Sequence, residues 1–243
     1  EGMDCSDLEL PDAQLELLRA LKETGKTVIA VVICGRPLVL TQVCEIADGV
    51  ILGFYPGPRG GQAIAEVISG RVAPSGRLPV SLPRSTGQVP VYYNYKNSYR
   101  AMNYMDEEAG PLFPFGYGLG YGTFEWGNCS LSTERCNVAA LENKGLTISF
   151  SVKNTSERGG YIVPQIYVTD VAASTVRRVK ELKAFQKVWL DAGQERYVSL
   201  QLGKEAFCLW NQKMKYVAEP GVFQIELSDS AQTIWKGEFT LCI

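Results

Sequence analysis

Tyrosines gather between residues 89 and 104, and their rings are the side chains of this sequence best suited to hold a ligand. Aromatic faces stack on the apolar faces of sugar rings, and loops commonly carry binding residues. The same rings would serve equally well to pack a long loop across an interface between domains. Both interpretations stay open. The candidates for sugar binding are Tyr92, Tyr93 and Tyr95, and Tyr99 and Tyr104 follow in the same stretch.

A loop rich in proline and glycine, residues 55–61, lies between a predicted strand and a predicted helix. Open α/β sheets bind ligands at this place, beyond the carboxyl end of a strand. Arg59, beside the start of the helix, could hold an anion or a sugar hydroxyl. Proline and glycine also punctuate ordinary loops, and we favour a tight turn that needs glycine. Arg59 remains a candidate binding residue.

Histidine is absent from the sequence. This excludes Ser-His-Asp triads, Cys-His pairs and histidine metal sites within the 243 residues. Carboxylates would then have to carry any proton transfer, unless the partner groups lie elsewhere. The acidic run at residues 106–108 is typical of a solvated surface. We expect neither a metal nor a cofactor.

The composition indicates an ordinary globular protein, with 46% hydrophobic and 21% charged residues and a formal net charge of −2. Nothing in it points to nucleic acid or a membrane as a partner. The seven cysteines include no Cys-x-x-Cys pair, which favours free thiols over disulfides or a zinc site. A cytoplasmic location is therefore expected. Because the chain starts at Glu1 without methionine, we expect it to be a fragment.

The elements that must position these candidates differ between the two halves of the chain. In the first half, leucines recur at helical spacing from Leu15 to Leu21, with Pro11 at the first helical position and Gly25 as the stop. Residues 27–34 form a β-branched run that predicts a strand buried on both faces. Helix, strand and helix follow at 38–46, 49–54 and 62–69. This order predicts an α/β layer with parallel strands.

Residues 110–122 separate the two halves. Pro111 and Pro114 forbid a continuing helix, and glycines occupy every second position from 116 to 122. The aromatic residues between them favour burial, so a packed hinge that docks two domains is expected rather than a solvated linker. The predicted domains are residues 1–122, including this connector, and residues 123–243.

The second half alternates apolar and polar residues with a period of two. Residues 146–153, 198–202 and 223–227 show this pattern, and turn signals separate them at the spacing of a sandwich. About seven strands without cysteine bridges predict a fibronectin- or immunoglobulin-like β-sandwich. The fold class is thus α/β plus all-β, and the second half offers no catalytic constellation.

A set of motifs, in order along the whole chain, resembles the C-terminal part of family 3 glycoside hydrolases of the bacterial β-glucosidase type. The first half carries Gly35-Arg36-Pro37-Leu38, residues 60–67, residues 74–79, Val91-Tyr92-Tyr93-Asn94 and residues 114–119. The second half carries residues 165–168, 181–185 and 210–221, which are similar to the fibronectin type III-like domain that ends these enzymes.

The resemblance implies a retaining, exo-acting β-glycosidase. In such an enzyme a barrel domain supplies the nucleophilic aspartate, and the α/β domain supplies the acid/base glutamate. Neither the barrel nor the first part of the α/β domain lies in this sequence. We therefore expect the chain to be inactive alone and to be completed by an N-terminal barrel segment or a second chain.

Glu1 is the residue nearest to the family's acid/base position, because Glu1-Gly2-Met3-Asp4 resembles a Glu-Gly-x-Asp-Arg pattern. Cys5 stands where that pattern has arginine. The acid/base is therefore either Glu1 or a glutamate upstream of this chain. Tyr95 departs from the family pattern as well, since relatives often have histidine there.

The sequence leaves three functions open. The first is the C-terminal portion of a β-glycosidase that hydrolyses terminal β-linked sugars. The second is a non-catalytic accessory module that binds carbohydrate or stabilises a partner. The third is an interaction protein whose truncated sheet edge recruits another chain. The presence or absence of an upstream barrel with a catalytic aspartate separates the first from the second.

Overall fold

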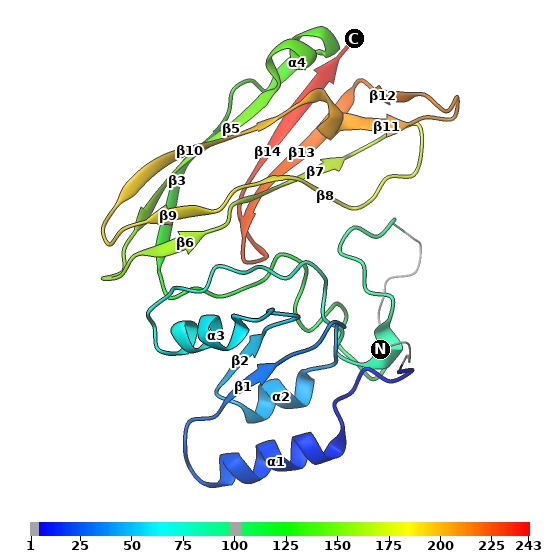
Figure 1. The fold of residues 1–243 in the computed structure, drawn as a ribbon. Coiled ribbons are helices and arrows are strands. Elements are labelled where there is room, and N and C mark those ends of the chain that lie inside the picture. Colours follow the sequence, from blue (N-terminus) through cyan, green and yellow to red (C-terminus); the bar gives the residue numbers. More distant parts are fainter. Residues whose placement is uncertain (1–4, 98–103) are drawn as a thin grey trace. The chain divides into compact units, whose positions relative to one another are not determined.

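A computed structural model describes residues 5–97 and 104–243, which form two compact units. Unit 1 comprises residues 5–72, 78–93 and 104–115 of the described chain. Unit 2 comprises residues 73–77, 94–97 and 116–243. The predicted combination of an α/β part and a β-sandwich is confirmed (Figure 1).

Unit 1 is built on two parallel strands, β1 (Ile29–Val32) and β2 (Gly49–Leu52). Its helices are α1 (Asp12–Glu23), α2 (Thr41–Ile46), α3 (Gly60–Ile68) and the short 3-10 helix η1 (Thr86–Gln88). A small core joins α1 and α2 to the sheet, and its buried members are Leu15, Val32, Leu40, Val43 and Leu82. This core positions the loops that follow each strand.

Glycine ends two of these helices, as the sequence predicts. Gly25 follows α1 with φ +72°, and Gly70 follows α3 with the same value. Such left-handed backbone conformations favour glycine. Pro11 immediately precedes the first residue of α1 rather than occupying it. Its fixed φ still fits the start of a helix.

The burial predicted for residues 27–34 is wrong. The strand β1 spans only Ile29–Val32, and Val32 is buried whereas Ile29, Val31 and Ile33 are exposed. Alternate side chains of a strand point to opposite faces, and the small core of unit 1 covers only one of them. The second helix also begins at Thr41, later than predicted, after Leu40.

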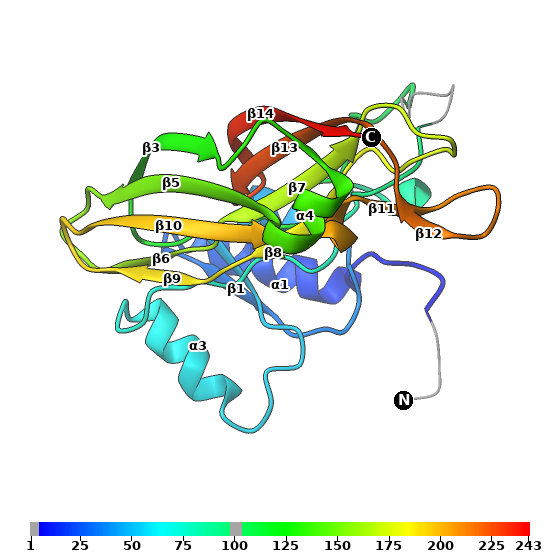
Figure 2. The same ribbon diagram turned by 90° about the horizontal axis from the view of Figure 1, so that it is seen from above.

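Unit 2 is a β-sandwich of two larger sheets with two short ribbons (Figure 2). The five-stranded sheet has the order β4-β14-β13-β7-β8, and the three-stranded sheet has the order β10-β5-β3. The ribbons are β6-β9 and β11-β12. The strands are β3 (Phe124–Leu131), β4 (Arg135–Asn137), β5 (Leu146–Asn154), β6 (Gly160–Ile162), β7 (Gln165–Asp170), β8 (Glu181–Phe185), β9 (Val188–Leu190), β10 (Glu195–Leu202), β11 (Cys208–Trp210), β12 (Tyr216–Ala218), β13 (Gly221–Asp229) and β14 (Gln232–Cys242).

Helix α4 (Val138–Lys144) and the 3-10 helix η2 (Lys204–Phe207) complete this unit. The alternation predicted for the strands is confirmed, because Leu146, Ile148 and Phe150 of β5 are all fully buried. The core also contains an aromatic group in which the Phe207 ring lies 5.1 Å from Phe223 and 5.2 Å from Phe239.

The connector, residues 110–122, belongs to unit 2 from Gly116 onward, and hydrogen bonds join this part to the rest of that unit. The Gly116 carbonyl accepts a hydrogen bond from Gln165 Nε2 at 3.0 Å. The Gly118 N–H donates to the Ser230 hydroxyl at 3.2 Å, and that hydroxyl donates to the Gly118 carbonyl at 2.7 Å. The backbone of the connector also packs closely against residue 76, and only glycine fits at position 118, because a Cβ there would overlap the Gly76 carbonyl. The exact domain boundary stays a prediction.

Candidate functional site

Two of the predicted sugar-binding tyrosines belong to unit 1. The Tyr93 ring stacks on Phe115 with the ring centroids 4.1 Å apart and the planes 12° from parallel. This contact holds the Tyr93 ring within unit 1, and Phe115 covers one face of that ring. Tyr92, the neighbouring residue, is 62% exposed, so its ring is available to a ligand.

Tyr95 belongs to unit 2, where its backbone is bound to the loop between β7 and β8. The Tyr95 carbonyl accepts a hydrogen bond from the Val179 N–H at 2.9 Å, and Lys96 forms a β-bridge with Arg178. Arg178 also donates to the Asn94 carbonyl at 2.9 Å. The side chain of Tyr95 is exposed. Its role in sugar binding stays a prediction, as do those of Tyr92 and Tyr93.

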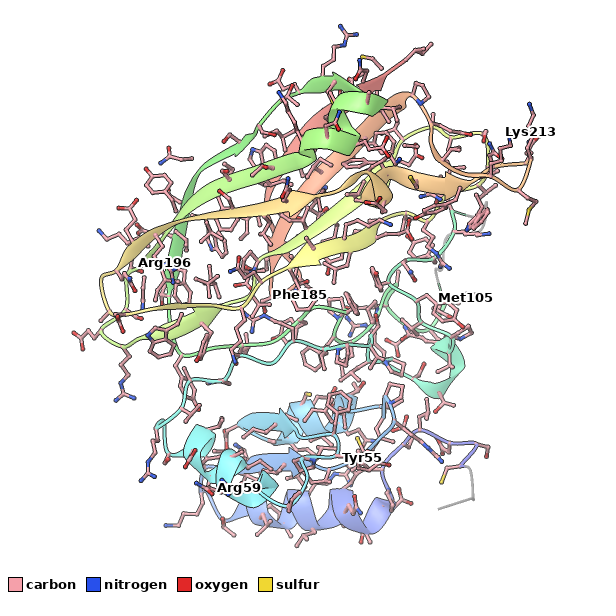
Figure 3. All side chains as sticks on the ribbon, turned by 45° about the horizontal axis from the view of Figure 1, so that its top comes forward. Tyr55, Arg59, Met105, Phe185, Arg196 and Lys213 are labelled. Atoms are coloured by element: carbon pink, nitrogen blue, oxygen red, sulfur yellow. The ribbon has the colours of Figure 1, made fainter. Side chains whose placement is uncertain are left out.

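Arg59 immediately precedes α3 and is exposed, on the loop that leads from β2 into that helix (Figure 3). The loop contains a tight turn, with Gly57 at φ +71° and a hydrogen bond from the Gly60 N–H to the Gly57 carbonyl at 3.0 Å. A Cβ at Gly60 would overlap Pro56. The turn explains the glycines without a ligand, so binding by Arg59 stays a prediction.

Tyr55 is a candidate that the sequence analysis did not single out. It follows β2 and is 81% exposed, and its ring lies against Gly35, which follows β1. A Cβ at Gly35 would overlap that ring. The carboxyl ends of β1 and β2 therefore meet at one edge under an aromatic side chain, where α/β sheets bind ligands. An aromatic residue directly after a predicted strand was the signal available.

Glu1 lies outside the described residues, and its assignment as acid/base stays a prediction. The first described carboxylates along the sequence are those of Asp7 and Glu9. The Asp7 carboxylate accepts hydrogen bonds from the Glu9 N–H and the Thr86 hydroxyl, each at 3.0 Å. These bonds lower the pKa of Asp7, with the Glu9 bond as the larger cause. Burial, followed by the charge of Asp7, raises the pKa of Glu9.

An open groove of about 690 Å³ runs along α1 and β1. Its walls are mostly apolar, and Cys5, Asp7, Glu9 and Arg36 add polar groups to its lining. Leu17 and Leu21 of α1 are 61% and 47% exposed in it. The groove follows the strand edge of β1, which pairs with β2 on its other side and with no further strand among the described residues.

Two known domain families match parts of this chain. Residues 1–121 match the glycosyl hydrolase family 3 C-terminal domain, and residues 162–231 match the fibronectin type III-like domain. The chain therefore belongs to glycosyl hydrolase family 3. The resemblance drawn from its motifs is confirmed.

Individual relatives are similar to this chain over nearly its whole length. A periplasmic beta-glucosidase of Salmonella typhimurium is 41% identical over 99% of this chain, and a beta-xylosidase of Formosa agariphila is 40% identical over 96%. The crystal structure of a beta-glucosidase from Listeria innocua in complex with isofagomine superimposes with a TM-score of 0.89 at 35% identity, over 97% of this chain.

The chain spans about a third of these relatives, namely 32% of each of the two enzymes and 34% of the Listeria protein chain. It corresponds to the C-terminal portion of a β-glucosidase-like protein of family 3, as expected. In the part of the chain that the structure describes, no helix is long and apolar enough to cross a membrane.

Proposed function

We propose that this chain works as the C-terminal portion of a retaining, exo-acting β-glycosidase that hydrolyses terminal β-linked sugars. In this proposal an N-terminal barrel supplies the nucleophilic aspartate, and the chain alone is inactive. Family membership and the names of the relatives support the reaction class. The open groove along the edge of β1 is the structural observation that carries the proposal.

The groove supports completion of unit 1 by an N-terminal segment or a second chain. An unpaired strand edge presents backbone N–H and C=O groups that another strand can pair. Beside it lie large apolar side chains, Leu17, Leu21 and Val31, which are exposed to water. Fully burying one such side chain gains about 1.5–3 kcal/mol. A partner that adds a strand and an apolar face would therefore bind with considerable free energy.

The proposed chemistry needs two carboxylates and water, and no cofactor. Retention requires the carboxylates to lie about 5 Å apart, one attacking the anomeric carbon and one protonating the leaving oxygen. Glu1, or a glutamate upstream of it, supplies the proton. Tyr92, Tyr93, Tyr95 and Arg59 are each proposed to contact the sugar, without any arrangement of the two units being implied. The exposed rings of Tyr92 and Tyr95 support this role.

The direct test is hydrolysis of a panel of 4-nitrophenyl β-glycosides by this chain, by the N-terminal barrel portion of the same open reading frame, and by their mixture. The proposal requires activity in the mixture and none with this chain alone. A Glu1→Ala variant in the active mixture then tests the acid/base. Activity of the chain alone would refute the account of the nucleophile.

A non-catalytic accessory module that binds carbohydrate is the alternative function. Exposed aromatic residues in unit 2, such as Trp210 and Tyr216, favour it. Sugar binding by the chain, together with an inactive mixture in which the two portions associate, would establish this alternative.

A cytoplasmic location is also proposed. All seven cysteines are free thiols, which supports a reducing compartment. Burial raises the pKa of the thiols of Cys44, Cys129, Cys136 and Cys208, which favours the protonated thiol over the reactive thiolate. Fractionation of the source cells with a periplasmic marker would test the location, because the Salmonella relative is named as periplasmic.

A further inference from the structure

The β11–β12 ribbon of unit 2 carries an exposed pair of aromatic rings. Trp210 and Tyr216 lie directly opposite each other across the antiparallel ladder, with ring centroids 5.4 Å apart and planes inclined by 42°. They are 60% and 49% exposed, whereas the adjacent Leu209 is buried. Alternate residues of a strand face opposite sides, so the ribbon is anchored by Leu209 and presents both rings to water.

Hydrogen bonds hold this ribbon in one shape. The Asn211 side-chain oxygen accepts from the backbone N–H groups of Lys213 and Lys215 at 2.9 and 3.1 Å. The Met214 N–H donates to the Asn211 carbonyl at 2.9 Å, which closes the turn. The Tyr216 hydroxyl donates to the Glu205 carbonyl at 3.3 Å. A ring pair that is already ordered loses little conformational entropy when it binds a ligand.

The loop between β7 and β8 contacts both the turn and the base of the ribbon, through Gln212 and Glu219. Gln212 Nε2 lies 3.4 Å from the Ser174 carbonyl, to which it donates. The Ser174 hydroxyl and N–H in turn donate to the Glu219 carboxylate at 2.6 and 3.0 Å. Figures 1 and 2 show the ribbon at one end of the sandwich of unit 2, and Figure 3 shows Lys213 at its outer tip.

The chemistry around the rings fits a carbohydrate. Between them the turn carries the exposed polar side chains of Gln212, Lys213 and Lys215, whose N–H groups can donate to sugar hydroxyls. Met214 is its single apolar side chain. A specific protein interface needs a broader apolar centre and about 800 Å² on each partner, which is large for so short a ribbon. Flat amphipathic rings edged by donors match the faces and hydroxyls of pyranoses.

We propose that Trp210 and Tyr216 form a platform that binds a β-linked glucan chain, with neighbouring pyranose rings stacked on the two aromatic faces. The choice of β-linked sugars rests on the proposed function, whereas the platform itself rests on the ring geometry. The lysine and glutamine side chains of the turn would hydrogen-bond the hydroxyls of the bound chain.

The test is electrophoresis of the 243-residue chain in native gels that contain a soluble β-glucan, with dextran, an α-glucan, as the control polymer. Retardation is expected in the β-glucan gel alone. Trp210→Ala and Tyr216→Ala should each weaken binding about tenfold or more, because central aromatic anchors dominate such interfaces. Trp210→Phe, which keeps a ring, should retain part of the binding.

The matched control is Tyr197→Ala, which removes an exposed aromatic ring on β10 of the same unit. This variant should bind like the unaltered chain. No retardation of the unaltered chain, or equal retardation of all variants, would overturn the proposal. A change of oligomeric state in Trp210→Ala would also overturn it and assign the pair to self-association. Because binding is read without turnover, these outcomes are independent of whether hydrolysis is found.

Discussion

Arg77 and Asp229 form an ion pair that is almost fully withdrawn from water. The guanidinium Nε and Nη2 donate to one Asp229 oxygen at 3.0 and 2.7 Å, and the two side chains are only 10% and 12% exposed. The second Asp229 oxygen accepts from the Val163 N–H at 3.4 Å. Removal of one member of such a pair leaves the other charge buried and uncompensated.

Arg77→Ala should therefore lower the free energy of unfolding by about 3–5 kcal/mol. Urea unfolding followed by circular dichroism measures this loss. The matched control is Arg71→Ala, whose guanidinium is 77% exposed and lies 3.9 Å from Glu66, and which should change stability by at most about 0.5 kcal/mol. Equal effects of the two substitutions would contradict the role given to Arg77.

Glu226 is a second half-buried carboxylate of unit 2, with its side chain 13% exposed. Burial works to raise its pKa, but hydrogen bonds from Ser228 at 2.7 Å and Lys180 at 3.0 Å outweigh burial, and the pKa lies below the usual 4.5. The unfolded chain then binds more protons than the folded chain between the two pKa values. The carboxylate thus contributes stability above pH 4.5, which is lost as the pH falls through the folded pKa.

Glu226→Gln should destabilise the chain at pH 7 by about 1.5–3 kcal/mol, the usual strength of hydrogen bonds to a charged group. The difference from the unaltered chain should shrink as the pH falls below 4.5. Urea unfolding at pH 7, 5 and 3 measures it. The exposed Glu157→Gln is the control, and a difference for Glu226→Gln that stays constant from pH 7 to 3 would refute this assignment.

At the scale of elements, the connector depends on glycine at position 116. Gly116 has φ +82°, and a Cβ there would overlap the Gln165 amide oxygen and the Tyr167 hydroxyl. Tyr167 donates a hydrogen bond of 2.6 Å to that same amide oxygen, so Gly116, Gln165 and Tyr167 form one buried cluster. A side chain at this position is strained by its backbone and by its neighbours at once.

Gly116→Ala should lower the free energy of unfolding by about 1–3 kcal/mol because of the left-handed backbone alone. The control is Gly61→Ala in α3, where a Cβ would meet open space. That substitution should stabilise the chain by about 0.5–1 kcal/mol through helix propensity. Thermal unfolding of both variants separates the cases, and a neutral Gly116→Ala would show that the connector does not need glycine.

The groove of α1 and β1 gives a prediction about exposed apolar surface. Leu17→Lys combined with Leu21→Lys should leave the stability of the chain nearly unchanged, because both side chains are already exposed. The same variant should bind less of a hydrophobic fluorescent dye. Leu15→Ala, at a buried position of the same helix, should instead cost about 2–5 kcal/mol. Strong destabilisation by the lysines would mean that the groove is closed in solution.

Local pattern explains which parts of the fold the sequence predicts. The strands β5, β10 and β13 were predictable because alternate residues face a core that unit 2 itself provides. The burial of β1 was not predictable from the sequence. The run Ile29–Val32 has the same composition whether one or both faces of the strand are covered by other elements. Arg77 and Asp229 are 152 residues apart, and no pattern in the sequence links them.

The candidate site was predictable only in part. Tyrosines in a loop are visible in any sequence, but the stacking of Tyr93 on Phe115 and the exposure of Tyr92 depend on how that loop folds. The contact of Tyr55 with Gly35 joins residues that follow different strands, so it needs the parallel sheet to be known first. The assignment of Glu1 as the acid/base residue stays a prediction.

At the scale of the whole molecule, the proposed function makes the chain one partner in a larger enzyme. Among its described residues, unit 1 exposes an apolar groove and a strand edge that no further strand pairs, and the chain spans about a third of the relatives it matches. Activity should therefore depend on association through the groove. The chain with Leu17→Lys and Leu21→Lys, which is expected to keep its fold because both side chains are exposed, is the variant that separates association from chemistry.

The most direct measurement is a titration in which this chain is added to a fixed amount of the N-terminal barrel portion, with release of 4-nitrophenol from a β-glucoside as the readout. The account predicts a rate that rises from zero and saturates near equimolar amounts, and a much higher concentration for half-saturation with the double lysine variant. Hydrolysis by this chain without the barrel portion, or a saturation curve unaffected by the lysines, would contradict it.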